Sequence, residues 1–284
     1  MIAQSEAGKT LNFHRDVAAA VLALSLFFGG NARADWVTAA KSSARLIDGG
    51  ATEGDRYAGV ELRLDGSAVT YWRDAGEAGA PPTFDFAGSE NVQQAKVLYP
   101  QPQIIDEGGI QAFGYRHGVI FPVRVTPADR KKPVLLALTV DYAVCEAICL
   151  SNRATLRILL PPQADPVESG SPFAEALKQV PKNLVAAQAK SLAAIAPLEP
   201  AGGKAQWRLK ILAPGASGVF IEAPKGFYVE TRPGGAGDWL LTMVEHPPAK
   251  SLPEAPLRVT LSGAAPAEFD LPLPPAPEPS KRFQ

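Results

Sequence analysis

The sequence predicts an all-β protein with two domains, and three observations lead to this prediction. The chain has 284 residues, which exceeds the length of one typical domain. Its 27 prolines and 25 glycines are spread along the chain, as expected for many short strands joined by turns. Between these turns, short apolar runs and runs that alternate with period two recur in both halves of the chain.

Residues 1–34 have the features of a cleaved export signal. Arg15 precedes an apolar run over residues 17–28, and Ala32 and Ala34 then stand at the two positions that a signal peptidase reads. The run is shorter than the ~20 apolar residues that cross a bilayer, which disfavours a membrane anchor. We expect cleavage after Ala34, which would leave a soluble mature protein in the periplasm.

Residues 35–165 are expected to form the first domain. Residues 58–64 alternate apolar and polar side chains, and residues 68–72 are expected to pair with them as a hairpin across the turn at residues 65–67. Further strands are expected at residues 118–125, 134–140 and 155–160. Strands at this spacing, with no helix of about ten to fifteen residues between them, favour a sandwich or barrel over a thioredoxin-type core.

The pattern changes after Pro161 and Pro162. Residues 166–200 are expected to be a helical, Ala- and Pro-rich linker, with a first helix capped by Ser171 and a weaker one over residues 186–196. A second, smaller β domain is expected at residues 201–272, from strand-like runs at residues 205–212, 218–222, 227–230, 239–244 and 257–262. Residues 273–284 are expected to be a Pro-rich extended tail.

The overall charge and the motif content argue against two classes of function. The chain has 28 basic and 29 acidic residues, a formal net charge of −1, whereas binding to a phosphate backbone depends on a surplus of Lys and Arg. No nucleic acid is therefore expected as a partner. The G-x-S-x-G and H-E-x-x-H motifs of hydrolases are also missing from the sequence.

Two cysteines, Cys145 and Cys149, carry the clearest chemical signal. They stand between the expected strands at residues 135–140 and 155–160, at the turn that joins them. In an oxidising compartment such a pair is normally a disulfide. As a staple, the bond would close a very short loop and stabilise the fold by only about 2 kcal/mol. At a loop tip it would be open to attack by another protein's thiolate, which disulfide exchange requires.

The spacing alone leaves three functions open. These are an exchangeable disulfide, a structural disulfide in a binding or scaffold module, and soft-metal capture. For metal capture, Cys145, Cys149 and His117 would bind Cu(I) or Zn(II) once the pair is reduced. Haem attachment is excluded, because Leu150 follows Cys149 where a His is required. Glu146 and Asp141 would disfavour a thiolate by like-charge repulsion, whereas a helical turn beginning at Cys145 would favour one, so the sequence leaves the thiol pKa open.

A set of short motifs over residues 71–161 adds to the cysteine pair. The motifs are Tyr71-Trp72-Arg73, Pro81-Pro82, Gly88-Ser89-Glu90-Asn91, Tyr99-Pro100, Asp106-Glu107-Gly108-Gly109, Gly114-Tyr115, Phe121-Pro122 and Asp141-Tyr142-x-x-Cys145-x-x-x-Cys149. In this order they resemble the N-terminal periplasmic domain of the thiol:disulfide interchange protein DsbD, especially its form in bacterial copper-tolerance (Scs-type) systems. The resemblance is far more specific than the cysteine spacing by itself.

The resemblance implies an immunoglobulin-like β-sandwich with the redox cysteines at one end. It implies a protein-disulfide reductase component that takes electrons from a membrane-embedded thiol reductase. The electrons would pass to periplasmic disulfide isomerases, cytochrome c maturation factors or other thioredoxin-like proteins. No cofactor besides the redox-active disulfide is expected.

The resemblance also assigns residues to a site around the catalytic pair, Cys145 and Cys149. Asp106 and Glu107 match an acidic pair beside the family's disulfide, and Glu146 and Tyr142 are expected to modulate the site. A loop aromatic shields the disulfide in the family and has no clear counterpart here, since Gly108 follows the acidic pair. Either the shield is absent or Ile110, Phe113 or Tyr115 takes its place, and Tyr71 and Trp72 match an aromatic position near the family's site.

One difference from the family concerns the partners. The full-length interchange protein continues into a multi-helix membrane domain and a thioredoxin-like domain, and this sequence carries neither. We therefore expect a separate membrane reductase upstream and a separate thioredoxin-like protein downstream, with the second β domain able to dock either one.

Overall fold

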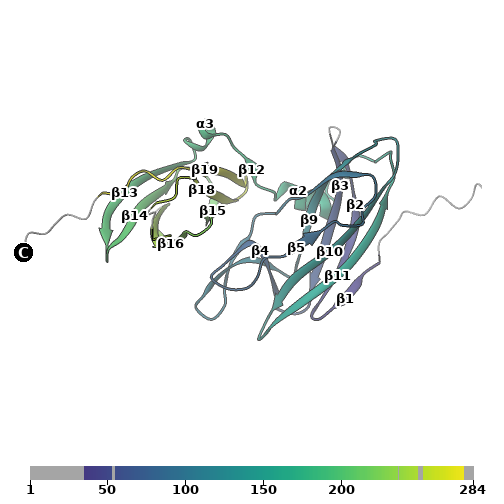
Figure 1. Cartoon of the computed structure of the whole chain (residues 1–284), viewed down its shortest axis with the longest axis horizontal. Helices are drawn as coiled ribbons and strands as arrows, with labels where there is room; N and C mark the ends of the chain where they lie inside the picture. The colour runs from purple at the N-terminus through teal and green to yellow at the C-terminus, as the bar shows by residue number, and fades with distance from the viewer. Residues whose placement is uncertain (1–34, 53–54, 236, 249–251, 278–284) are drawn as a thin grey trace, which may run out of the picture.

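The computed structural model describes residues 35–52, 55–235, 237–248 and 252–277, and these residues form two β units that lie next to each other along the long axis of the molecule (Figure 1). The all-β prediction is confirmed. No helix among the described residues is long and apolar enough to span a membrane. The expected export signal, residues 1–34, lies outside the described residues.

The first unit is an antiparallel β-sandwich of the immunoglobulin-like kind. One sheet has the strand order β1-β2-β3-β9-β6, and the other has the order β11-β10-β4-β8-β7, with β5 paired to β10. The strands are β1 (Val37–Ala39), β2 (Ser42–Thr52), β3 (Asp55–Leu64), β4 (Val69–Gly76), β5 (Thr83–Asp85), β6 (Val92–Val97), β7 (Gln103–Asp106), β8 (Gln111–Arg116), β9 (Gly118–Pro127), β10 (Val134–Cys145) and β11 (Cys149–Leu160).

The alternation of side chains explains the sandwich. Along β11, Leu156, Ile158 and Leu160 are buried, whereas Arg157 and Leu159 between them are exposed. Residues two apart in a strand point to the same face, so the apolar set of each sheet meets that of the other sheet in one core.

The predicted hairpin between residues 58–64 and 68–72 is wrong. Strand β3 pairs with β2 and β9, whereas β4 pairs with β8 and β10, so the turn between β3 and β4 crosses from one sheet to the other. Tyr71 and Trp72 in β4 are both fully buried although they point to opposite faces. Tyr71 packs in the cluster around Cys145, whereas Trp72 packs in the main core. The sequence signal for a hairpin is local and does not register partners that lie elsewhere in the chain.

The segment between the units is shorter than the sequence predicts. Helix α2 (Pro172–Lys178) forms with Ser171 as its cap, as expected, but helix α3 (Ala186–Ala189) is a single turn. Strand β13 (Ala193–Ala201) lies within the range expected to be linker and pairs with the next strand of the second unit. The Ala-rich run suggested a helix by intrinsic propensity, and the sheet partner overrides that preference.

The second unit is a smaller sandwich of two four-stranded sheets, with the orders β12-β19-β18-β15 and β13-β14-β17-β16. Its remaining strands are β12 (Lys182–Asn183), β14 (Lys204–Ile211), β15 (Ala216–Glu222), β16 (Tyr228–Gly235), β17 (Asp238–Glu245), β18 (Leu257–Gly263) and β19 (Ala267–Leu271). The two sheets enclose an apolar core that includes Trp207, Leu241 and Phe269.

The first part of the Pro-rich tail packs against this core. The indole Nε1 of Trp207 donates a hydrogen bond to the carbonyl oxygen of Pro274 at 2.8 Å, and Leu273 and Ala276 contact the core. A buried indole N–H requires an acceptor, and proline keeps its carbonyl even though it has no N–H. The described part of the tail, residues 273–277, forms neither helix nor strand, as expected, but it is held in place as far as Ala276.

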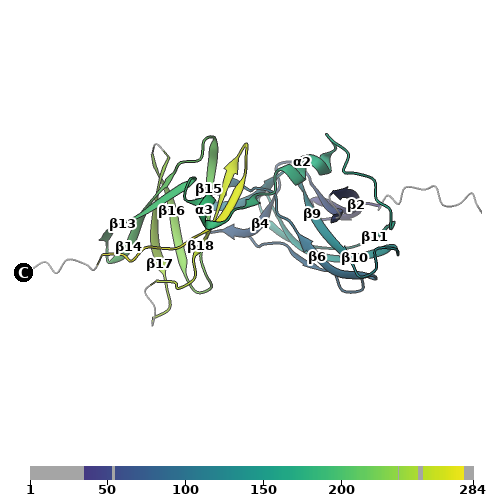
Figure 2. The same ribbon diagram turned by 90° about the horizontal axis from the view of Figure 1, so that it is seen from above.

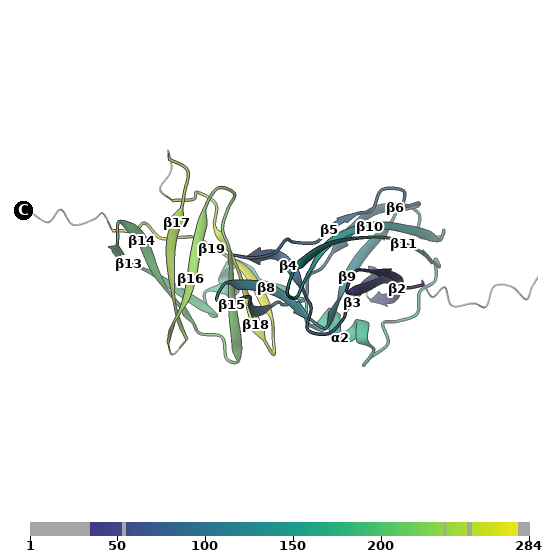
Figure 3. The same cartoon turned by 90° about the horizontal axis from the view of Figure 1, so that it is seen from below.

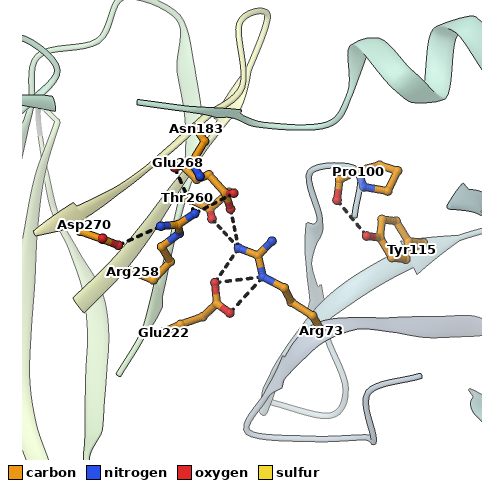
Figure 4. A network of polar contacts seen from close by, with 9 residues as sticks. All are labelled: Arg73, Pro100, Tyr115, Asn183, Glu222, Arg258, Thr260, Glu268 and Asp270. Atoms are coloured by element: carbon orange, nitrogen blue, oxygen red, sulfur yellow. Dashed lines mark hydrogen bonds and ion pairs between the residues drawn. The ribbon is translucent and has the colours of Figure 1, made fainter. Parts of the chain in front are cut away.

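The two units share an apolar contact and an ion-pair network. Phe220 of β15 is buried among the core residues of the first unit, with its ring centroid 5.7 Å from that of Trp72 and 5.0 Å from that of Phe113. Strand β4 lies at the junction in all three ribbon views (Figures 1, 2 and 3). From it, Arg73 reaches Glu222 and Glu268 of the second unit, each with a shortest N–O distance of 2.7 Å (Figure 4).

Candidate redox site

The cysteine pair forms a disulfide at the tip of a long hairpin. Cys145 ends β10 and Cys149 begins β11, and the two residues are direct partners in the ladder, with their Cα atoms 4.0 Å apart. Strands β10 and β11 are paired from this tip to residues 134 and 160, so the hairpin holds the disulfide at one end of the sandwich. The expected position of the pair at a turn between strands is confirmed.

The two cysteines differ sharply in exposure. Cys145 is only 3% exposed and packs in a small apolar cluster with Val69, Tyr71 and Ile105, whereas Cys149 is exposed. An incoming thiolate must approach a sulfur from outside along the S–S axis. The arrangement therefore presents Cys149 to a partner and keeps Cys145 inside.

Tyr71 and Glu107 lie against the disulfide. The Tyr71 hydroxyl donates a hydrogen bond to Glu107 Oε1 at 2.8 Å and lies 3.9 Å from Cys149 Sγ. Burial, and then the hydrogen bond to the Glu107 carboxylate, raise the pKa of Tyr71 well above its usual value, so the phenol stays protonated. A Glu107 carboxylate oxygen and both sulfurs all lie within 4.8 Å of one another.

The loop between β7 and β8 brings Glu107 to this position. Asp106 Oδ1 accepts a hydrogen bond from Gly109 N at 2.6 Å, and Glu107 N donates to Ile110 O at 2.9 Å. Gly108 and Gly109 both have positive φ, which a tight turn of this kind requires. Of the acidic pair identified in the sequence, Glu107 faces the sulfurs and Asp106 shapes the loop.

Glu146, at the hairpin tip, is paired with groups on two other turns. Its carboxylate accepts hydrogen bonds from Ser67 Oγ at 2.6 Å and from Lys41 Nζ at 3.2 Å. The Ser67 hydrogen bond, and then Lys41, lower the pKa of Glu146. The charge that the sequence suggested would repel a thiolate is thus balanced by a cation.

Four residues expected near the disulfide have other contacts in the structure. Tyr142 is buried and its hydroxyl is 2.9 Å from Ser42 Oγ, and the Tyr115 hydroxyl donates to Pro100 O at 2.8 Å within the sandwich. Trp72 and Phe113 pack on Phe220 of the second unit. Of the four aromatic candidates for a shield, Tyr71 is the one that the described contacts place beside a sulfur. Side chains alternate along a strand, so neighbours in sequence face different surroundings.

His117, considered above as a metal ligand, does not lie in the group around the sulfurs. The described residues place Glu107 there instead, together with Cys145 and Cys149. The sequence also did not point to Gly79, which packs on the Tyr71 ring, since a close approach of this kind leaves no local pattern.

Comparisons with known proteins agree with this geometry. Residues 43–161 match the family described as thiol:disulfide interchange protein DsbD, N-terminal. Among solved structures, the chain is similar to the N-terminal periplasmic domain of ScsB from Proteus mirabilis, with a TM-score of 0.64 and 17% sequence identity over 86% of this chain and 100% of that one. At this identity the similarity establishes the fold. No curated protein sequence matches.

Proposed function

We propose that this chain, whose residues 43–161 match the DsbD N-terminal family, is a periplasmic thiol–disulfide exchange protein that works through Cys145 and Cys149. The observation that carries the proposal is the asymmetric disulfide at the hairpin tip, with Cys149 exposed and Cys145 buried. A purely structural bond needs no exposed sulfur, and closing so short a loop stabilises the fold by only about 2 kcal/mol. Thiol–disulfide exchange does need an exposed sulfur, because the attacking thiolate must reach it.

The proposed reaction moves two electrons. A partner thiolate attacks Cys149 Sγ and forms an intermolecular S–S bond, while Cys145 Sγ leaves with the bonding electron pair and takes up a proton. The partner's second thiol loses its proton and attacks the partner sulfur of the mixed disulfide. Cys149 is then released as a thiolate and the partner becomes a disulfide. With a client disulfide the same steps run in reverse, starting from attack by the Cys149 thiolate.

Tyr71 and Glu107 would act on the charge that develops at the sulfurs. The Tyr71 phenol has a single proton, which it donates to Glu107 beside the disulfide; in the reduced protein it can donate that proton instead to the Cys149 thiolate, 3.9 Å from its oxygen, and stabilise it. The Glu107 carboxylate competes for the same proton and disfavours a thiolate nearby by like-charge repulsion. The pair would therefore set how readily reduced Cys149 reacts.

The proposed partners follow from the family and from the surface beside the disulfide. We expect a membrane-embedded thiol reductase upstream and a thioredoxin-like or disulfide isomerase protein downstream. Two exposed apolar side chains lie on the segments that carry the site, Ile148 at 70% exposure and Ile110 at 46%. Exposed apolar groups beside a reactive centre favour docking of another protein.

The test begins with the full mature chain in glutathione or dithiothreitol redox buffers, with free thiols trapped and counted. An exchange protein should titrate within the range of thioredoxin-fold oxidoreductases, about −120 to −270 mV. A bond that stays oxidised below about −300 mV would identify a structural disulfide and overturn the proposal.

Single cysteine variants then test the asymmetry. Cys145→Ser leaves the exposed Cys149 free and should accumulate mixed disulfides with a thioredoxin-like protein, whereas Cys149→Ser leaves the buried Cys145 and should accumulate far fewer. The double variant is the control for non-specific capture. Equal trapping by the two single variants, with both folded by circular dichroism, would contradict the assigned roles.

Soft-metal binding by the reduced pair is a second candidate, because Glu107 adds a carboxylate to the two sulfurs within 4.8 Å. Titration of the reduced chain with Zn(II) should then give a one-to-one complex that Glu107→Gln weakens. Oxidised protein is the control, and an unchanged affinity in Glu107→Gln would remove Glu107 from the site.

A further inference from the structure

The ring of Tyr71 is held in place by a loop that follows its own strand. Gly79 approaches the ring so closely that a Cβ atom at Gly79 would lie 2.1 Å from Tyr71 Cε1 and 2.2 Å from Cζ. Its φ of +83° is also one that other residues rarely adopt. Tyr71 is 0% exposed, and the loop at Gly79 forms part of its cover.

The second unit binds this loop. Glu77, two residues before Gly79, donates its backbone N–H to Gln111 O at 3.0 Å within the first unit. Its side-chain Oε1 accepts a hydrogen bond from the Tyr228 hydroxyl of strand β16 at 3.0 Å. The loop over Tyr71 is therefore held by hydrogen bonds from both units.

The same strand is held by the second unit immediately after Tyr71. Trp72 packs on Phe220, and Arg73 forms ion pairs with Glu222 and Glu268 (Figure 4). The Arg73 side chain is 23% exposed, so water only partly screens these pairs. The second unit therefore contacts this segment at both ends, at Trp72 and Arg73 and again at Glu77.

We propose that the second β unit is a positioning element for the redox site: through Tyr228–Glu77 and the Gly79 loop it holds the Tyr71 hydroxyl against Glu107 and Cys149. This rests on the function proposed above and gives the second unit a role in it. If the loop is released, Tyr71 can turn away, and its single O–H, which either Glu107 or the Cys149 thiolate accepts, leaves the site. Without this donor the Cys149 thiolate is less stable beside the Glu107 carboxylate, so the pKa of the Cys149 thiol rises.

The main experiment removes one hydroxyl from the second unit. In the full chain carrying Cys145→Ser, so that Cys149 is the single thiol, the rate of alkylation by iodoacetamide is measured against pH. Tyr228→Phe should raise the thiol pKa of Cys149 and slow alkylation at neutral pH by about three- to tenfold, the usual worth of one hydrogen bond. Tyr57→Phe is the matched control, because that hydroxyl also donates to a carboxylate, Asp55 Oδ2 at 3.3 Å.

A double variant separates positioning from general destabilisation. If Tyr228 acts through Tyr71, then Tyr71→Phe combined with Tyr228→Phe should show the same pH profile as Tyr71→Phe alone. Additive shifts in the double variant, or a Tyr228→Phe profile that matches the unsubstituted chain, would overturn the proposal. Neither readout needs a redox partner, so this result is independent of whether the disulfide proves exchangeable.

A pair of glycines tests the loop itself. Gly79→Ala should move the Tyr71 ring and reproduce the effect of Tyr71→Phe on the Cys149 profile. Gly88→Ala is the control, since Gly88 has nearly the same φ, +84°, but nothing lies within 4 Å of its added Cβ. Equal profiles for the two alanine variants would contradict the role given to Gly79.

Discussion

At the scale of single residues, the site depends on the different surroundings of two bonded sulfurs. Cys145 sits with Tyr71 and Ile105 in an apolar cluster, while Cys149 is exposed and lies near the Tyr71 hydroxyl. Burial without a partner disfavours a thiolate, and a hydrogen-bond donor favours one. The exposed sulfur, Cys149 Sγ, is therefore also the one that lies near a hydrogen-bond donor, the Tyr71 hydroxyl.

The charge of Glu107 should control the thiol pKa of Cys149. In the Cys145→Ser background, Glu107→Gln removes a carboxylate within 4.8 Å of the sulfur and should lower that pKa by about one unit, which speeds alkylation at neutral pH. The matched control is Asp106→Asn, which removes the adjacent charge but keeps an oxygen acceptor for Gly109 N. A pH profile that moves equally in both variants would indicate a general charge effect.

At the scale of the element, the β10–β11 hairpin carries the site, and its tip is fastened to two other turns. Glu146 connects the tip to Ser67 in the turn between β3 and β4 and to Lys41 in the turn between β1 and β2. Three turns of the first unit are thus joined by side-chain contacts at the end where the disulfide lies. This fastening depends on ionised Glu146, because a protonated carboxyl loses its attraction to Lys41.

The fastening should weaken in acid. The pKa of Glu146 in the folded protein lies below its ordinary value of 4.5, so its contribution to stability is present above pH 4.5 and is lost as the pH falls through the lower folded value. Glu146→Gln should therefore lower the urea midpoint of the oxidised protein slightly at pH 7. At pH 3 the midpoints of the two proteins should converge. A difference that is the same at both pH values would show that the Glu146 charge plays no part.

At the scale of the whole molecule, the two β units are joined by contacts on and near β4. Phe220 enters the core of the first unit, and Arg73 lies between Glu222 and Glu268 of the second. Replacing Arg73 with an uncharged residue would remove the guanidinium that pairs with the carboxylates of both Glu222 and Glu268. Breaking a fully buried ion pair costs about 3–5 kcal/mol, and partial exposure reduces that cost.

Arg73→Met should accordingly loosen the units by about 2 kcal/mol. Small-angle X-ray scattering should show a larger radius of gyration, and the connection between α2 and β12 should be cut faster by protease. Arg45→Met is the control, because Arg45 forms a comparably buried pair with Glu61 inside the first unit at 2.7 Å. An unchanged radius in Arg73→Met would mean that the other contacts between the units, such as those of Phe220 and Tyr228, hold them together without Arg73.

The sequence by itself determined the features that local pattern encodes. Turn residues and alternation predicted an all-β chain, and the spacing and context of Cys145 and Cys149 predicted a disulfide at a turn. The motifs around them indicated the family that residues 43–161 match. The all-β and disulfide predictions succeeded because each depends on residues within one turn or one strand of each other, and the family prediction because the motifs occur in a fixed order along the chain.

Only the tertiary structure decided which residues surround the disulfide. Tyr71 and Cys149 are 78 positions apart, and Tyr228 and Glu77 are 151 apart, so no local pattern brings either pair together. The same limit explains the wrong β3–β4 hairpin, because the partners of β4 are β8 and β10, far along the chain. At Ala193–Ala201, pairing with the following strand, β14, outweighed the helix preference of the Ala-rich run. The exposure of Cys149 and the burial of Cys145 arise from packing between segments far apart in the chain, and packing of that kind is settled only when the whole chain folds.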